Sequence, residues 1–139
     1  MPKSRQSMED YLEAILMITQ KQGYCKSIDV ANKLGFSKPS VSIAVAKLRE
    51  EGYIQEKSEK GHLELTESGI KIAEKMAERH RFFKEWLIHL GVDERTAYED
   101  ACGIEHWLSE ESFSKMRDFI TEKESKDHNG DLSFFDGKD

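Results

Sequence analysis

Cysteine is scarce in this chain, whose 139 residues include two, Cys25 and Cys102. Two thiols are too few for a disulfide framework and are typical of free cysteines in a reducing compartment. No apolar run is long enough to span a bilayer. The N-terminal Lys3 and Arg5 are followed by polar and acidic residues, not by the apolar core of a signal peptide. We therefore expect a cytoplasmic protein that has no membrane partner.

An excess of positive charge is also lacking, since the formal net charge is -6. The two halves of the chain differ, because residues 1–66 carry a net charge of +1 and residues 67–139 carry -7. The segment 37–49 contains Lys38, Lys47 and Arg49 and no acid. This local positive charge would attract a phosphate backbone, so DNA binding stays open despite the acidic total.

Helical periodicity predicts three helices in the N-terminal half. The first covers residues 7–21 and ends at Gly23. Ser27 is the expected N-cap of a short helix that Gly35 terminates, and Ser37 is the expected N-cap of a longer one, with Pro39 in its first turn. A short helix, a glycine turn and a longer helix form the arrangement of a helix-turn-helix.

The next segments alternate apolar and polar residues about a turn at residues 58–61, which predicts a β-hairpin wing over residues 53–65. Long helical patterns follow: one opens at Thr66 and ends near Gly91, one is capped by Asp93, and one covers residues 110–122. A chain of this length can complete a modest core by pairing with a second copy, so we expect a homodimer.

A thiol, a carboxylate and an imidazole occur at Cys102, Glu105 and His106, at offsets i, i+3 and i+4. On a helix these offsets share one face, so the three groups can converge on one divalent transition metal. Asp10 and Glu13 share a face of the first helix and are further candidate ligands. His80, midway along the long helix, is the sixth candidate.

The expected fold class is mainly α. A winged helix-turn-helix DNA-binding domain of three helices and a hairpin, over residues 1–70, is joined to an α-helical metal-binding and dimerisation domain over residues 71–124. A flexible acidic tail is expected over residues 125–139, where the composition becomes polar.

Several motifs in this order resemble the diphtheria-toxin-repressor family of metal-dependent transcriptional regulators. The resemblance covers roughly residues 7–122 and matches the short manganese-transport-regulator branch. The motifs that carry it are Met8-Glu9-Asp10-Tyr11-Leu12-Glu13, Pro39-Ser40-Val41-Ser42, Leu65-Thr66-Glu67-Ser68-Gly69, Arg79-His80-Arg81 and Cys102-Gly103-Ile104-Glu105-His106.

The resemblance implies a ligand role for the candidate metal residues, which are Asp10, Glu13, His80, Cys102, Glu105 and His106. Cys102 departs from the manganese branch, which has a carboxylate there, and matches the cysteine of the iron-dependent branch. Lys84 stands where family members often have a glutamate for an ancillary metal, so it disfavours a second metal bound in that manner.

The donor set leaves the physiological metal open between Fe(II) and Mn(II). A thiolate favours Fe(II), Zn(II), Co(II) or Ni(II), whereas the carboxylates are hard ligands that Mn(II) accepts. Co(II), Zn(II) or Ni(II) can therefore substitute in vitro.

The expected partner is a double-stranded DNA operator, read by the N-terminal end of the third helix in the major groove. The candidate DNA-binding residues supply hydroxyl, ammonium and apolar contacts. They are Ser37, Lys38, Pro39, Ser40, Ser42 and Lys47, with Lys60 in the wing. Ile43 departs from the iron branch, which has a glutamine there, so the operator sequence stays open.

The resulting hypothesis is a metal clamp that fixes the spacing of two recognition helices on a palindromic operator and represses metal-uptake genes. One alternative is a winged-helix thiol or redox sensor that uses Cys102. A metal-dependent hydrolase is a second alternative. We expect no enzyme and no small organic substrate, because the ligands are accompanied by neither a substrate-sized loop nor a separate general base.

Overall fold

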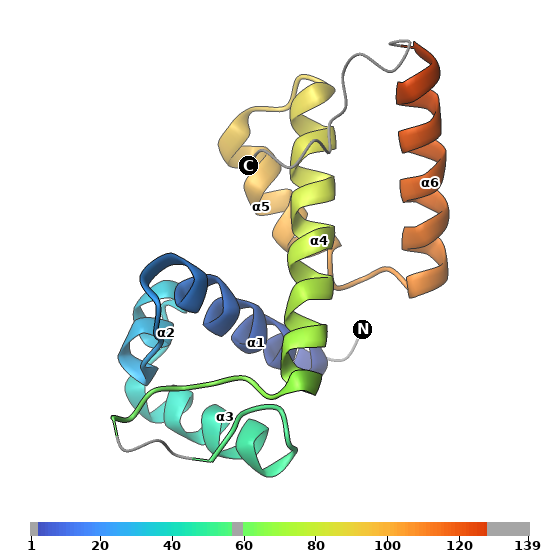
Figure 1. Ribbon diagram of the computed structural model, residues 1–139. Coiled ribbons are helices and arrows are strands. Elements are labelled where there is room, and N and C mark those ends of the chain that lie inside the picture. The colour runs from blue at the N-terminus through green and yellow to red at the C-terminus, as the bar shows by residue number, and fades with distance from the viewer. Residues whose placement is uncertain (1–2, 57–59, 128–139) are drawn as a thin grey trace. The chain divides into compact units, whose positions relative to one another are not determined.

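The computed structural model describes residues 3–56 and 60–127, and it divides the chain into two compact units, Met1–Met76 and Ala77–Asp139. The described residues are mainly helical (Figure 1). The helices are α1 (Lys3–Gln22), α2 (Ser27–Leu34), α3 (Lys38–Glu50), α4 (Glu67–His89), α5 (Glu94–Ile104) and α6 (Glu110–Asp127).

The first unit is built on α1, α2 and α3, which pack against one another. Their apolar stripes meet in one core, where each fully buried aliphatic side chain contributes roughly 1.5–3 kcal/mol. The buried residues of this core include Leu12, Ile15, Val30, Val41, Val45, Leu48, Ile54, Leu63 and Leu65. The expected three helices are therefore confirmed.

The turn between α2 and α3 depends on Gly35, whose φ of 73° lies in the left-handed region that glycine adopts without strain. The N–H groups of Gly35 and Phe36 both donate to the carbonyl of Ala31 and so end α2. Ser37 then caps α3 as expected, because its Oγ accepts a hydrogen bond from the N–H of Ser40 at 3.3 Å.

The expected N-cap of α2 was wrong by one residue. Ser27 is the first helical residue and Lys26 is the N-cap. The carboxylate of Asp29 accepts the N–H of Lys26 at 2.9 Å, so an acid inside the first turn bonds back to the main chain of the N-cap residue.

The wing hairpin is not confirmed. The described residues of this segment form one antiparallel bridge, between Ile54 and Leu65, and the predicted turn lies partly at residues 57–59, outside the described residues. The N–H of Leu63 donates to the carbonyl of Cys25 at 2.7 Å. The segment around Leu63 is thus bonded to the loop after α1, and its pairing with the segment around Ile54 is short.

Thr66 begins α4, because its Oγ1 accepts the N–H of Gly69 at 3.2 Å and donates to the carbonyl of Gly52 at 2.7 Å. Gly69 lies directly against the main chain of Tyr53, and a Cβ at this position would overlap the Tyr53 carbonyl oxygen. Glycine is therefore required here for close approach and not for an unusual φ.

The second unit contains the later part of α4 with α5 and α6. Aromatic side chains dominate its core, and Phe82 and Phe113 pack edge to face at 5.5 Å. The buried residues are Phe82, Phe83, Ala101, Phe113 and Ile120. Asp93 caps α5 as expected, since its carboxylate accepts the N–H of Thr96.

The expected tail was partly wrong, because α6 continues to Asp127 and residues 125–127 are helical. Residues 128–139, the rest of the expected tail, lie outside the described part of the chain. Among the described helices, none combines the length and the hydropathy needed to cross a membrane.

Replacing Gly69 with alanine should lower the free energy of unfolding by about 1–3 kcal/mol, because the new methyl group is forced against rigid backbone. Gly103 is the matched control, since it is also helical and a Cβ there meets no heavy atom within 4 Å. Gly103→Ala should be neutral or stabilising by up to about 1 kcal/mol. Urea denaturation with a chelator present measures both, and equal effects would refute the packing argument.

Candidate metal centre and DNA-binding face

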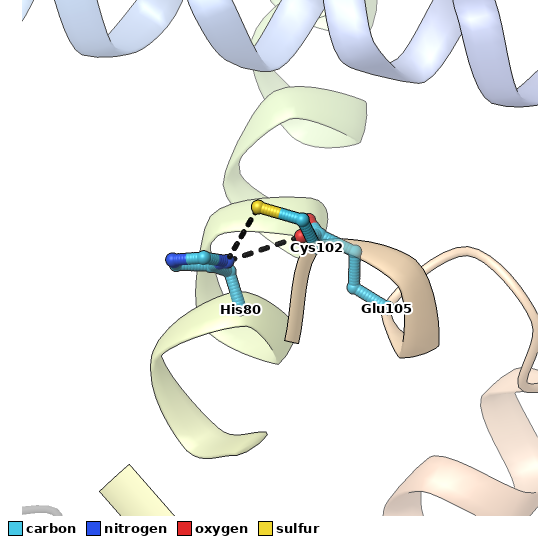
Figure 2. A group of neighbouring side chains, drawn as sticks. All are labelled: His80, Cys102 and Glu105. Carbon is cyan, nitrogen blue, oxygen red and sulfur yellow. Dashed lines mark hydrogen bonds and ion pairs between the residues drawn. The ribbon is translucent and has the colours of Figure 1, made fainter. Parts of the chain in front are cut away.

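Three potential metal ligands converge in the second unit, from two helices (Figure 2). The Nδ1 of His80, on α4, lies 3.2 Å from a carboxylate oxygen of Glu105 and 3.7 Å from the Sγ of Cys102. The three donor atoms all lie within 4.8 Å of one another. The helical offset between Cys102 and Glu105 brings both toward His80, as their spacing indicated.

The cluster is largely enclosed. Glu105 is 1% exposed and His80 is buried, whereas Cys102 is half-buried. The ring of Tyr98, one helical turn before Cys102, packs edge-on against His80 with centroids 4.8 Å apart. This contact restricts the rotation of the imidazole.

The donor set fits a divalent transition metal. Ligand atoms that share one ion at about 2.0–2.3 Å lie roughly 3–4.6 Å from one another. The distances from the His80 Nδ1 to Glu105 and to Cys102, 3.2 and 3.7 Å, fall in this range. Sulfur, nitrogen and oxygen donors together suit Fe(II), Co(II) or Zn(II), and the nitrogen and oxygen donors also suit Mn(II).

Of the other three predicted ligands, one belongs to the second unit and two to the first. His106 follows Glu105 and is buried, but it is not one of the three residues that converge there. Asp10 and Glu13 belong to the first unit, one helical turn apart on α1, with Glu13 buried and Asp10 half-buried. Their role as ligands stays a prediction.

The predicted DNA-binding residues lie on and before α3. Val41, Val45 and Leu48 face the core, which leaves the opposite side of the helix in solvent. Its exposed residues include the candidates Lys38, Pro39, Ser40, Ser42 and Lys47. Ser37 is exposed as well, and it caps the helix with its hydroxyl. Lys60 is exposed next to the segment 57–59.

Ile43 stands out on this side of α3 because 72% of it is exposed, the largest exposure among the large hydrophobic residues described. Arg49, by contrast, is half-buried and its Nε donates to the carbonyl of Gln55 at 2.8 Å. Arg49 thus supports the fold of the first unit, while the two lysines remain available to solvent.

Sequence reasoning missed two residues at the metal cluster. Tyr98 carried a usable signal, because it precedes Cys102 by four positions and so shares its helix face. Arg79 belonged to a motif that carries the resemblance, but nothing indicated its partners, since its buried guanidinium contacts residues 26–31 positions later in the chain.

A helix-turn-helix unit combined with a helical unit that gathers metal ligands defines a class, the metal-regulated DNA-binding proteins. The family description "Iron dependent repressor, N-terminal DNA binding domain" matches residues 4–62. The description "Iron dependent repressor, metal binding and dimerisation domain" matches residues 66–131.

Individual relatives agree with this class. The HTH-type transcriptional regulator MntR of Bacillus subtilis (strain 168) is 37% identical over 121 residues, which cover 87% of this chain and 84% of that protein. The structure of T. acidophilum IdeR is 29% identical with a TM-score of 0.70 and covers 81% of this chain and 53% of its own.

A manganese-dependent transcriptional repressor, solved in complex with manganese, is 27% identical with a TM-score of 0.69 and covers 78% of this chain and 50% of its own. The chain therefore spans about half the length of these two solved relatives.

This chain belongs to the iron-dependent repressor family, also called the diphtheria-toxin-repressor family, and to its manganese-transport-regulator branch. Members are metal-dependent transcriptional regulators that have a DNA-binding domain and a dimerisation domain. The comparisons do not support the thiol-sensor alternative.

The two cysteines should differ sharply in reactivity. Cys25 is fully buried, and this burial together with the nearby carboxylate of Asp29 raises the pKa of its thiol to about 12. Because the native pKa lies above the ordinary value, the unreactive neutral thiol persists at pH 8. With a chelator present, iodoacetamide should modify Cys102 and spare Cys25, as measured by peptide mass spectrometry. Denatured protein is the control, and native modification of Cys25 at the denatured rate would contradict the assignment.

Proposed function

We propose that this protein is a repressor of metal-uptake genes that binds a palindromic operator as a homodimer when it is loaded with Fe(II) or Mn(II). The observation that carries the proposal is the convergence of His80, Cys102 and Glu105 within 4.8 Å, in a domain whose family description is metal binding and dimerisation. The bound metal supplies a charge that links ligands from separate parts of the chain.

The three clustered residues form the core of the proposed centre, and the remaining ligands come from Asp10, Glu13 and His106. Carboxylates brought together repel one another until a cation is present. In the proposed switch Asp10 and Glu13 of α1 would hold the cation together with the ligands of the second unit, and its charge would offset this repulsion. In the metal-free protein this link is lost. DNA binding must then offset the conformational entropy that is lost when α1 becomes ordered.

Cys102 sets the selectivity of the proposed centre. A thiolate strengthens binding of Fe(II), Zn(II) and Co(II) relative to Mn(II). The carboxylates are hard ligands, so the centre can still bind Mn(II). Fe(II) and Mn(II) are therefore both proposed as signals, and Zn(II), Co(II) and Ni(II) as substitutes in vitro.

The proposed DNA contact uses the exposed side of α3 in the major groove. Lys38 and Lys47 contact phosphates, and the hydroxyls of Ser37, Ser40 and Ser42 contact phosphates or base edges. Pro39 contacts a thymine methyl group, and Lys60 contacts the backbone beside the groove. Two such helices in a homodimer would read two half-sites, which is why the proposed operator is palindromic.

Metal should strengthen operator binding by about 5–150-fold, the usual range for coupling between two sites. Fluorescence anisotropy on a palindromic duplex, titrated anaerobically with Mn(II), Fe(II), Co(II) or Zn(II) against a chelated sample, measures this effect. Lys47→Ala is the control, because it should weaken DNA binding and leave metal binding unchanged. Equal operator affinity with and without metal would overturn the proposal.

Cys102→Asp should keep the switch and change its selectivity. Replacing sulfur with oxygen should lower the affinity for Zn(II) relative to Mn(II) by about tenfold or more. The charge-transfer absorption of a Co(II)–thiolate bond should be present in the wild type and absent in the variant. Cys102→Ser is the matched control for size. A wild-type Co(II) complex without this absorption would exclude Cys102 as a ligand.

A further inference from the structure

We infer that Arg79 is a positioning residue that aligns the metal ligands, an inference that rests on the proposed metal centre. Arg79 precedes His80 on α4, and its side chain is buried, with 3% of the residue exposed. Nothing in the family descriptions or in the relatives' names assigns it a role.

The guanidinium of Arg79 contacts three consecutive parts of the second unit. Its Nη1 donates to the carbonyl of Glu105 at 3.3 Å and to the carbonyl of Leu108 at 2.5 Å. Its Nη2 donates to the carboxylate of Glu110 at 2.9 Å. One side chain of α4 thus bonds to the end of α5, to the turn that follows, and to the first residue of α6.

One of these acceptors is a group that a helix C-terminus leaves without an intrahelical partner. Glu105 is the C-cap of α5, so its carbonyl lies at the negative end of that helix, while Leu108 belongs to the connection between α5 and α6. A planar guanidinium with several N–H donors can bond to both carbonyls at once, whereas a lysine ammonium at the end of a flexible stem aligns fewer of them.

Glu105 is therefore held by two neighbouring residues of α4 at two different groups. His80 contacts its carboxylate at 3.2 Å, and Arg79 contacts its main-chain carbonyl. The carbonyl contact sets the position of α5 along α4 and hence the positions of the Glu105 carboxylate and the Cys102 thiol. His106 follows Glu105 directly and would be positioned by the same bond.

The burial of Arg79 supports a geometric role. A buried cation loses its hydration, and an apolar side chain would fill the same space without that cost. The charge of Arg79 is compensated by Glu110 and by the ring of Phe113, 5.0 Å from the guanidinium carbon. A positive charge also does not attract a metal cation, so the expected benefit to metal binding comes from ligand alignment.

Arg117 offers a control, because it contacts the same aromatic ring as Arg79 but is bonded to a side chain on α4 and not to the end of α5, and its side chain is 37% exposed. Its guanidinium carbon lies 5.4 Å from the same Phe113 ring, and its Nη1 donates to Glu78 at 3.1 Å. Arg117→Lys removes a comparable guanidinium and leaves the end of α5 unchanged.

The test measures Co(II) affinity by competition with a chelator, and Co(II)–thiolate absorption, in the full-length protein. Arg79→Lys should weaken Co(II) binding about 10–100-fold, the usual effect of losing an outer contact to a metal ligand. It should also shift or weaken the thiolate absorption, while Arg117→Lys should change neither. Thermal unfolding of each metal-free variant reports stability separately.

The outcomes separate this inference from the proposed function. If the wild type binds no Co(II), the proposed metal centre fails. If the wild type binds Co(II) and Arg79→Lys matches it in affinity and spectrum, Arg79 is purely structural and the inference fails. Should Arg79→Lys not fold, Glu110→Gln tests the same guanidinium at its Nη2 contact, because the Glu110 side chain is 59% exposed and tolerates substitution. It should weaken Co(II) binding more than Arg117→Lys does, and an equal affinity would overturn the inference.

Discussion

The buried carboxylate of Glu105 is the constraint on which the second unit depends. An ionised carboxylate taken out of water costs several kcal/mol unless opposite charge or hydrogen bonds compensate it. The contact with His80 supplies part of that compensation and requires α4 and α5 to approach closely. The aromatic core then fills the space beside this contact, and a bound cation would complete the neutralisation. Folding and the proposed metal binding thus use the same side chain.

The main helices could be predicted from sequence because their signals are local. Gly35 and Ser37 marked the turn before α3, and the i, i+3 spacing of Cys102 and Glu105 located two of the three clustered ligands. His80 was a candidate from its place in the long helix, but its ligand role rested on the family resemblance, since a single histidine within an amphipathic helix carries no information about its partner. The contacts of Arg79 join positions that are distant in the sequence, and no local pattern encodes them.

What the sequence did not settle has physical causes as well. Residues 125–127 are polar and charged and were expected to belong to a flexible tail, yet the preceding Lys123 and Glu124 are good helix formers and α6 continues to Asp127. The expected hairpin depended on alternation of apolar and polar residues, which does not specify the partner strand. The bond from Leu63 to Cys25 shows that the second arm has a competing partner. The role of Asp10 and Glu13 requires the relation between two units, about which spacing within one helix says nothing.

Phe113 makes cation–π contacts with two arginines, since the guanidinium carbons of Arg79 and Arg117 both lie within 5.4 Å of its ring centre. Fewer substitutions should therefore be tolerated at Phe113 than at Phe82, a neighbour in the same core. Leucine could replace the volume of either ring, but at position 113 it would remove the π surface that faces two cations. Divergence at this position would require compensating changes at both arginines, so the three residues are expected to vary together or not at all.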